Sequence, residues 1–341
     1  HMDKKLQEEY LIRLENVTKK FKIRGEGEWK TVSLTAVDHV SFGIYPGETF
    51  GLVGESGCGK STLAQTMLRL VEATEGAVYY QGRDIYKMNA RELQGIRREM
   101  QIVFQDPYDS LDPRMTLEQT MLEPFKIHGV GTREERRRRI RELFRMVGLP
   151  EEQLCRYPHQ LSGGQRQRVS IARSIALSPK LLVCDEAVSA LDVSIQAQVL
   201  NILSDLKREL GLTYLFVSHD LSVVRFISDR VGVMYFGHMV ETAEMDELFR
   251  SCRHPYTKAL LAAVPNPNPR EKRERAPLEG EVPSLISPPA GCIFHQRCPY
   301  ADERCRTVPP KLQNIGNDHW VACHKCGAAG GGGIDRIPAE T

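Results

Sequence analysis

One segment constrains the fold of this chain more than any other, because it joins an apolar strand to a helix through a glycine-rich turn. The apolar stretch Glu48-Thr-Phe-Gly-Leu-Val53 is followed by Gly54-Glu-Ser-Gly-Cys-Gly-Lys-Ser61, and helical periodicity continues over 61–70. Glycines in such a turn let backbone N–H groups point inward at a helix N-terminus, where they can bind phosphate oxygens. The segment therefore predicts an α/β fold that contains a P-loop.

The P-loop residues are expected to bind both phosphate and magnesium. Lys60 would reach the β- and γ-phosphates of a nucleotide, and the Ser61 hydroxyl would bind Mg²⁺, which prefers oxygen ligands. The other residues expected to line the phosphate site are Gly54, Glu55, Ser56, Gly57, Cys58, Gly59 and Thr62. A turn without a ligand is the alternative, and the Lys-Ser-Thr ending argues against it. Cys58 raises the further alternative of a reactive thiol, because a helix N-terminus lowers thiol pKa values.

The composition indicates a globular protein of one large or two modest domains. Of its 341 residues, 41% are hydrophobic, which suffices for a sizeable core. Lys and Arg number 46 against 44 Asp and Glu, so the net charge does not point to nucleic acid as the main partner. No apolar run has the roughly 20 residues that a membrane span needs. We therefore expect a cytosolic protein without a membrane span.

Strand and helix patterns alternate along most of the chain. Strands are expected at 11–21, 36–44, 78–80, 100–104, 180–184 and 213–217, and helices at 163–177 and 194–210. This alternation predicts a parallel sheet. Residues 106–177 are mostly helical and charged, which indicates a helical subdomain inserted into the α/β core. Within it, glutamates interleave the arginines of 133–142, and helical pairing between them favours a solvated helix face over nucleic-acid binding.

Two further motifs have the residue types that phosphate chemistry requires. Leu181-Leu-Val-Cys-Asp185-Glu186 is an apolar strand that ends in two carboxylates, at the edge where α/β sheets bind ligands. Asp185 would bind Mg²⁺, usually through water, and Glu186 would polarise the attacking water; a strand that ends in solvated acids is the alternative. Leu161-Ser162-Gly163-Gly164-Gln165 offers glycine N–H groups and a serine hydroxyl at a helix start, which suits a γ-phosphate.

Taken together, these motifs resemble, in order and spacing, the nucleotide-binding subunits of ABC transporters. The resemblance covers roughly residues 11–249 and includes Gln105, Ser189-Ala-Leu-Asp192 and His219. It implies that Gln105 binds Mg²⁺ and links it to the transmembrane partner, and that His219 is a catalytic residue near the γ-phosphate. Asp192 would belong to the nucleotide site. Phe21 falls where the family stacks an aromatic ring on adenine, although a core strand residue would fit this position equally.

The resemblance implies a mechanism that needs two protomers. In the family, the LSGGQ motif of one subunit faces the P-loop of the other, so that two ATP molecules are sandwiched at the dimer interface. ATP closes the dimer because it binds the closed state better, and its hydrolysis lets the dimer open. The chain is thus expected to be an ATPase whose cassette, over 3–263, has a parallel-sheet core, an antiparallel β subdomain and the helical insertion.

Two segments and the C-terminal cysteines resemble, more specifically, the F-type ATPases of oligopeptide/dipeptide permeases. The segments are Gln101–Arg114 and His254-Pro-Tyr-Thr-Lys258. The partners implied are a D-type ATPase, or a second copy in isolation, two transmembrane permease subunits and, indirectly, an extracellular peptide-binding protein. The chain would lie at the cytoplasmic face of the cell membrane, as a peripheral subunit. Nickel and glutathione importers of the same subfamily are alternatives.

A rival function from another class is a soluble ABC-type ATPase that acts on nucleic acid or ribosomes. Such proteins share the phosphate chemistry, but they usually carry tandem cassettes or long coiled coils, and this chain has one cassette. We therefore expect no nucleic-acid partner.

Five of the nine cysteines gather near the C-terminus, after a proline-rich stretch. We expect a linker over 264–291, a cysteine-rich module over 292–326 and a tail over 327–341. Four thiolates could hold a [4Fe–4S] cluster, and the resemblance implies this cofactor on Cys292, Cys298, Cys305 and Cys323. Zinc and plain buried thiols are alternatives; Cys326 could replace Cys323, and only these two have the close spacing usual for zinc. The module's role would be structural, or that of a redox sensor.

Overall fold

The computed structural model describes residues 9–24, 31–106, 110–264 and 288–326. The chain forms two compact units, each assembled from segments that are distant in sequence. We call the first the signature unit, which comprises His1–Ile12, Gly43–Thr49 and Tyr79–Val217. The second is the P-loop unit, which comprises Arg13–Phe42, Phe50–Val78 and Ser218–Thr341. The P-loop and the cysteine-rich segment therefore belong to the same unit.

The main sheet of the P-loop unit is mixed. In it β3 (Thr49–Val53) pairs in parallel with β9 (Arg230–Tyr235), and β9 pairs antiparallel with β10 (His238–Glu244). All residues of β3 are buried, which accounts for its continuous apolar sequence. The C-terminal region, residues 288–326, adds β12 (Trp320–Val321) and β11 (Gln313–Asn314) to this sheet. In the pairing of β10 with β12, Glu241 lies opposite Val321. Residues 313–321 are thus part of the sheet that carries the P-loop.

The P-loop unit also contains a second sheet and several helices. A second sheet contains β1 (Ile12–Arg24), β2 (Thr31–Ile44) and β4 (Glu75–Tyr80). The predicted strands at 11–21 and 36–44 are confirmed, and both are longer than predicted. The helices are α2 (Lys60–Met67), α9 (Leu221–Ile227), α10 (Met245–Ser251), α11 (Pro255–Ala263) and α12 (Glu303–Thr307).

The signature unit contains the predicted parallel strands. β6 (Met100–Val103) pairs with β7 (Leu181–Asp185), and β7 pairs with β8 (Thr213–Ser218), all in parallel. β7 and β8 are buried throughout, as their apolar sequences predicted. Between them runs α8 (Val193–Leu210), which ends at Gly211 in the left-handed region. The unit also contains β5 (Arg83–Asp84) and α3 (Ala90–Arg97).

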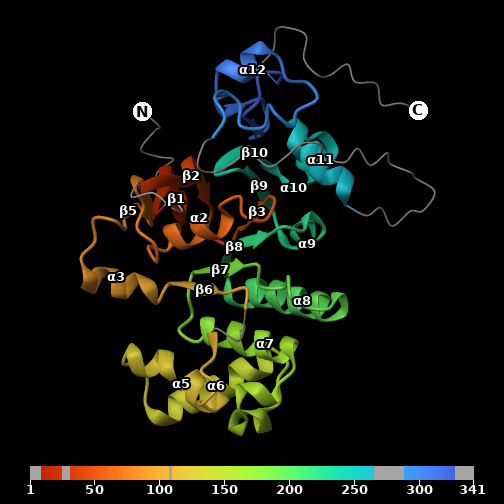
Figure 1. Cartoon of the computed structure of the whole chain (residues 1–341). Helices are drawn as coiled ribbons and strands as arrows, with labels where there is room; N and C mark the ends of the chain where they lie inside the picture. The colour runs from red at the N-terminus through yellow and green to blue at the C-terminus, as the bar shows by residue number, and fades with distance from the viewer. Residues whose placement is uncertain (1–8, 25–30, 107–109, 265–287, 327–341) are drawn as a thin grey trace, which may run out of the picture. The chain divides into compact units, whose positions relative to one another are not determined.

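Three helices of the signature unit form a small bundle within the interval predicted to be helical. They are α5 (Leu117–Ile127), α6 (Arg133–Met146) and α7 (Gly163–Ser174), and α5 packs against both of the others (Figure 1). Short 3₁₀ turns, η1 (Glu151–Cys155) and η2 (Pro158–Gln160), lead into α7. Each of the three helices begins with a capping box, at Thr116, Thr132 and Ser162, so the sequence fixes all three N-termini locally.

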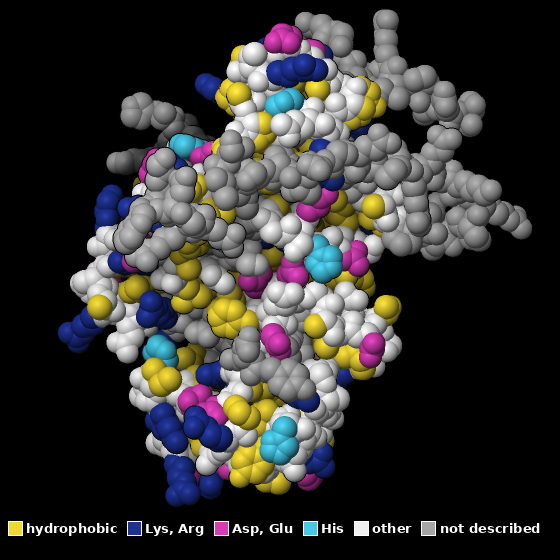
Figure 2. All heavy atoms as spheres, in the orientation of Figure 1, with side chains coloured by type: hydrophobic (Ala, Val, Ile, Leu, Met, Phe, Trp, Pro, Cys, Tyr) yellow, Lys and Arg dark blue, Asp and Glu magenta, His cyan; other side chains and the backbone are white. Residues whose placement is uncertain are grey.

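The arginines of α6 are largely matched by glutamates. Arg139 pairs with Glu142 within the helix, whereas Arg141 and Arg145 both pair with Glu151 of η1. Figure 2 shows Lys and Arg side chains gathered over the part of the molecule where Figure 1 places α5 and α6. The helical pairing predicted for this stretch is therefore confirmed for one pair, and the other pairs connect α6 to neighbouring elements.

None of the helices in the described part of the chain could cross a membrane. The longest of these, α8, has 18 residues but carries Asp, Lys, Arg and Glu in its last two turns. Such charges are costly in the hydrocarbon core of a bilayer.

Candidate functional site

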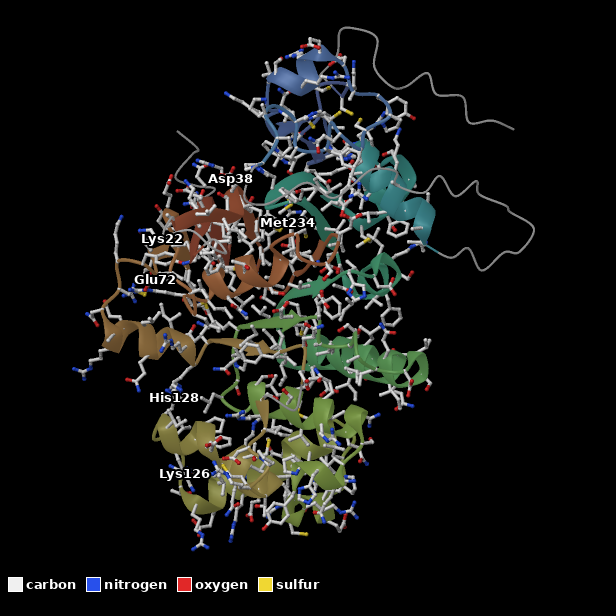
Figure 3. All side chains as sticks on the ribbon, in the orientation of Figure 1. Lys22, Asp38, Glu72, Lys126, His128 and Met234 are labelled. Atoms are coloured by element: carbon white, nitrogen blue, oxygen red, sulfur yellow. The ribbon has the colours of Figure 1, made fainter. Side chains whose placement is uncertain are left out.

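The P-loop connects the end of β3 at Val53 to the start of α2 at Lys60. Gly59 has a φ of 100°, and a Cβ atom there would lie 2.1 Å from the carbonyl oxygen of Ala36. Gly54 is similarly confined, because its Cβ would lie 2.1 Å from the carbonyl oxygen of Met234, labelled in Figure 3. Only glycine permits this tight loop at a helix N-terminus, the kind of geometry that binds phosphate groups.

Lys60 is held against the backbone of the loop. Its side chain is buried, and Nζ donates hydrogen bonds to the carbonyl oxygens of Gly54, at 2.8 Å, and Glu55, at 2.9 Å. The next residues of α2, Ser61 and Thr62, are half-buried, whereas Ser56 in the loop is exposed. A bound phosphate could therefore replace carbonyl oxygens as the partners of the ammonium group.

The predicted pair of carboxylates lies at the end of β7. Asp185 is 5% exposed, and Glu186 follows it with a φ of 48°, in the left-handed region that residues other than glycine rarely adopt. The backbone carbonyl of Glu186 accepts a hydrogen bond from the Ser189 hydroxyl at 2.9 Å. Gln105 donates from Nε2 to Glu186 Oε2 at 3.2 Å. The structure thus brings together two of the residues that the sequence predicted for hydrolysis.

The LSGGQ segment forms the start of α7. The Ser162 hydroxyl accepts from the Gln165 backbone N–H at 3.3 Å, and the Gln165 side chain accepts from the Ser162 N–H at 3.0 Å. Gly163 is exposed, whereas a Cβ on Gly164 would lie 2.4 Å from the Ile195 side chain on α8. The glycines therefore serve two purposes: Gly164 packs the helix start against α8, and Gly163 leaves the backbone there exposed.

The remaining predicted site residues are on the surface of their units. His219 follows β8 and is exposed, and Asp192 is the exposed N-cap residue of α8. Phe21 on β1 is 36% exposed, with Lys19 Nζ 4.8 Å from the centre of its ring. The alternative that Phe21 is a core residue is therefore wrong, and its stacking on adenine stays a prediction.

The prediction of a [4Fe–4S] cluster is not supported by the structure, nor is a zinc site. Among the described residues, no group of three or more His, Cys, Asp or Glu side chains is arranged to hold a metal ion. Cys292, Cys298, Cys305 and Cys323 interact electrostatically, so they lie in one region, but they do not converge as ligands. Burial raises the pKa of the Cys292 thiol to about 11.

The cysteine spacing thus shows that the thiols gather but does not show that they bind a metal. Cys323 and Cys326 form a pair, in which a hydrogen bond from Cys326 lowers the pKa of the Cys323 thiol.

Two residues near the P-loop escaped the sequence analysis. Arg297 contacts the carboxylate of Glu55, and Tyr256 accepts a hydrogen bond from the Glu55 backbone N–H at 2.9 Å. Tyr256 lies in the segment His254–Lys258, which was recognised only as a family resemblance. For Arg297 the sequence carries no signal, because its partner is 242 positions away.

Many nucleotide hydrolases contain a P-loop, but an LSGGQ helix start and a buried strand that ends in Asp-Glu narrow the class to ABC-type ATPases. Comparison with solved structures agrees with this. The dimeric ATP-binding cassette MJ0796, in a post-hydrolysis state bound to ADP and phosphate, has a TM-score of 0.61 and 34% sequence identity. The match covers 69% of this chain and 98% of that one.

Sequence comparisons give the family. Residues 37–189 match the ABC transporter family, and residues 240–305 match the oligopeptide/dipeptide transporter C-terminal region. A putative oligopeptide transport ATP-binding protein of Bacillus subtilis, YkfD, is 52% identical over 87% of this chain and 91% of its own length. The oligopeptide transport ATP-binding protein AppF of the same organism is 50% identical over 93% of this chain and 98% of its own length. The chain belongs to the ABC transporter family and carries its ATPase cassette.

Proposed function

We propose that this chain is the ATP-binding and ATP-hydrolysing subunit that energises an importer of dipeptides or oligopeptides. The observation that carries the proposal is the occurrence, in one chain, of the P-loop cassette and a C-terminal region typical of oligopeptide/dipeptide transporters. The names of relatives at about 50% identity, which describe oligopeptide transport, support the same cargo.

In this proposal, Lys60 moves from its carbonyl partners to the β- and γ-phosphates of ATP. Water attacks the γ-phosphorus while the bond to the bridging oxygen breaks, which yields ADP and phosphate. Glu186 polarises the water, and its hydrogen bond with Gln105 orients its carboxylate. His219 would contact the γ-phosphate, Phe21 would stack on adenine, and Asp192 would complete the site.

Magnesium would bind through oxygen donors of this chain. Ser61 offers a hydroxyl, Gln105 an amide oxygen and Asp185 a buried carboxylate, and such hard ligands suit Mg²⁺. Bound magnesium would neutralise charge on the β- and γ-phosphates. The residues Ser162 to Gln165 would bind the γ-phosphate of the nucleotide held by the partner protomer, because their exposed helix start attracts anions.

The proposed assembly contains two ATPases and two transmembrane permease subunits. The second ATPase is a D-type subunit, or another copy of this chain in isolation, and an extracellular peptide-binding protein delivers the cargo. The chain itself would lie at the cytoplasmic face of the membrane, as a peripheral subunit held by its permease partners.

The test is peptide uptake in cells that lack this gene and carry either the wild-type chain or Glu186→Gln. We expect labelled dipeptides and oligopeptides to enter with the wild-type chain and not with the variant. Uptake of nickel or glutathione that depends on Glu186, with peptide uptake unchanged, would overturn the proposed cargo. Purification of the chain with RNA or DNA and without permease subunits would favour the rival function.

A further inference from the structure

The C-terminal region is directly connected to the P-loop by an ion pair. Arg297 NH1 donates to Glu55 Oε2 at 2.9 Å, and NH2 donates to Oε1 at 3.1 Å. This is the bidentate geometry in which a guanidinium group binds a carboxylate most strongly. The side chain of Arg297 is only 6% exposed and that of Glu55 is 31% exposed, so solvent screens this pair less than an ordinary surface pair.

The other polar groups of Glu55 are also engaged. Its backbone N–H donates to the Tyr256 hydroxyl at 2.9 Å, and its carbonyl accepts from Lys60 Nζ at 2.9 Å. Contacts to three of its groups, the carboxylate, the N–H and the carbonyl, therefore fix this residue, which directly follows the first glycine of the loop. One of the three involves the lysine that would bind the phosphates.

A buried aromatic cluster holds Arg297 in place. Tyr235 of β9, Tyr256 of α11 and Phe294 of the C-terminal region are each 1% exposed or less. Their ring centres are 4.6 Å apart for Tyr235 and Tyr256, and 5.2 Å for Tyr235 and Phe294. The Arg297 guanidinium lies 5.9 Å from the centre of the Tyr235 ring, and NH1 also contacts the Tyr235 hydroxyl at 3.5 Å. Tyr235, itself packed in this cluster, and the Glu55 carboxylate therefore both restrict the guanidinium.

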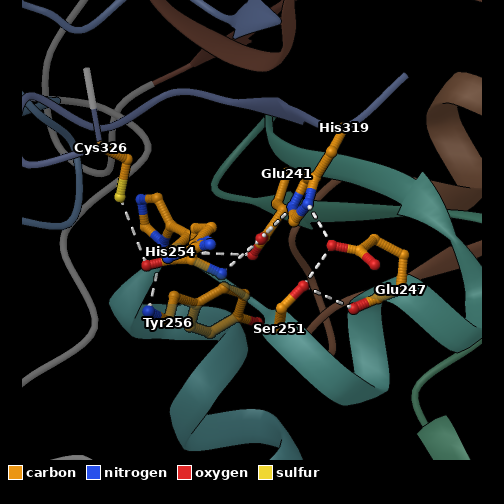
Figure 4. Close-up of polar contacts among 8 residues, drawn as sticks. Glu241, Glu247, Ser251, His254, Tyr256, His319 and Cys326 are labelled. Atoms are coloured by element: carbon orange, nitrogen blue, oxygen red, sulfur yellow. Dashed lines mark hydrogen bonds and ion pairs between the residues drawn. The ribbon is translucent and has the colours of Figure 1, made fainter. Parts of the chain in front are cut away.

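The C-terminal region is itself anchored by a buried carboxylate on β10. Glu241 is fully buried and accepts hydrogen bonds from His319 Nε2, at 2.7 Å, and from the backbone N–H of Arg253, at 2.6 Å (Figure 4). Its other oxygen accepts from the His254 N–H at 3.1 Å. Together with the pairing of β12 on β10, this contact ties residues 319–321 to the sheet that carries the P-loop.

We propose that Arg297 is a positioning residue for nucleotide binding, which acts through Glu55 to hold the P-loop in the shape that receives a triphosphate. The proposal rests on the proposed function insofar as it takes ATP as the ligand of the loop. Arg297 acts in two ways: it fixes the loop at Glu55, and it neutralises a carboxylate beside the place where a polyanion must bind. Residues 288–326 thereby set the affinity of the cassette for ATP.

The two actions of Arg297 can be separated by a double-mutant cycle in the full chain. The variants are Arg297→Ala, Glu55→Gln and the double variant, and the probe is the magnesium complex of the non-hydrolysable ATP analogue AMP-PNP, titrated by calorimetry. We expect Arg297→Ala to weaken binding roughly tenfold, since it leaves the Glu55 carboxylate unpaired near the phosphates. Removal of that charge in the double variant should restore affinity to within about threefold of the wild type.

Three further variants make the result unambiguous. Arg304→Ala removes an exposed arginine from α12 and should leave affinity unchanged. Arg297→Lys keeps the charge but loses the bidentate geometry, and it should bind two- to threefold more weakly, even if Arg297→Ala fails to fold. Lys60→Ala tests the proposed function: if it binds the probe as well as the wild type, the assignment of ATP to the P-loop fails.

The outcomes distinguish positioning from a structural role. Thermal unfolding of each variant without nucleotide reports on stability. If Arg297 were merely structural, Arg297→Ala would lower the unfolding temperature, and adding Glu55→Gln would not restore the affinity. Equal affinities for the wild type, Arg297→Ala and Arg297→Lys, with Lys60→Ala impaired, would overturn the inference while the proposed function stands.

Discussion

Gln105 donates a hydrogen bond to the carboxylate of Glu186 across 3.2 Å, and the backbone of Glu186 has a φ of 48°. A residue other than glycine in this conformation is strained by about 1–3 kcal/mol, and such strain persists where the surrounding structure enforces it. Here the Ser189 hydroxyl and the Val217 carbonyl hold the backbone of Glu186 through hydrogen bonds of 2.9 and 3.0 Å. The carboxylate is thus directed by its own backbone and by the amide of Gln105.

Glu186→Gln should separate ATP binding from ATP hydrolysis. Glutamine has nearly the same shape but cannot act as the anionic group that polarises water, so we expect turnover to fall at least about 100-fold. Affinity for ATP should be unchanged, because the substitution leaves the P-loop intact. Steady-state phosphate release and equilibrium binding of ATP check the two expectations.

Lys60→Ala is the matched comparison, since it should weaken ATP binding itself. Retention of more than a tenth of wild-type turnover in Glu186→Gln, in the assembled transporter, would rule out the role proposed for this carboxylate.

Gly59→Ala should damage the P-loop through sterics alone. The added Cβ would lie 2.1 Å from the Ala36 carbonyl oxygen, and alanine is strained at a φ of 100°. We expect a loss of about 1–3 kcal/mol in the free energy of unfolding, together with loss of ATP binding. Urea unfolding and calorimetric titration measure the two effects.

Gly95→Ala provides the control for this experiment. Gly95 lies inside α3, and a Cβ there would have nothing within 4 Å, so the substitution should stabilise the protein by roughly 0.5–1 kcal/mol. If both glycine variants behaved alike, the steric explanation of the P-loop would be untenable.

The strands of the signature unit could be predicted because buried parallel strands have continuous apolar sequences, as β7 and β8 do. The hairpin of β9 and β10 was missed for a local reason. Its turn consists of Phe236 and Gly237 at φ values of 52° and 83°, and phenylalanine is not a residue that normally indicates such a turn. Because these turn residues do not indicate a hairpin, β9 and β10 could not be predicted from the sequence.

The site was predictable only where a short motif encodes it. The P-loop and the LSGGQ helix start are local structures, so their residues specify their own geometry. The contact between Glu55 and Arg297 joins residues 242 positions apart and depends on the packing of an aromatic cluster, for which the sequence has no local pattern. The spacing of the C-terminal cysteines likewise does not specify whether their thiols converge on a metal, because convergence of ligands depends on the fold.

The free energy of unfolding should decrease as the pH falls from 7 to 5, because His254 has a lower pKa in the folded protein than in the unfolded chain. Burial lowers the pKa of this imidazole to about 4, and the nearby Glu241 carboxylate only partly offsets that effect. In the unfolded chain the pKa is about 6.5, so between pH 6.5 and 4 the unfolded state binds a proton that the native state does not. The free energy of unfolding therefore decreases as the pH falls, by about 2 kcal/mol from this group between pH 7 and 5.

Urea unfolding of the wild type and of His254→Asn at both pH values checks this expectation. Asparagine can still accept the hydrogen bond that His254 Nδ1 takes from the Tyr256 N–H at 3.1 Å, but it does not titrate. The variant should lose less stability than the wild type between pH 7 and 5. An equal loss in both proteins would mean that other groups govern the acid sensitivity.

Cys58 should be unreactive although it lies in the P-loop. Its position near a helix N-terminus and the Lys60 ammonium both favour the thiolate, but burial is the larger effect and raises the pKa of the Cys58 thiol above its ordinary value. The side chain is 5% exposed, whereas Cys155 is exposed. With iodoacetamide at pH 7.5, Cys155 should react at least about ten times faster than Cys58, as followed by mass spectrometry of digested peptides.

Cys58→Ser separates reactivity from function in the same protein. Serine keeps a small side chain that can pack under the loop, so ATP binding should be preserved and sensitivity to alkylation should be unchanged from the wild type. Rapid labelling of Cys58 that ATP prevents, with activity lost in proportion, would show instead that the loop opens enough to expose the thiol. In that case burial could not be the effect that controls the reactivity of the Cys58 thiol.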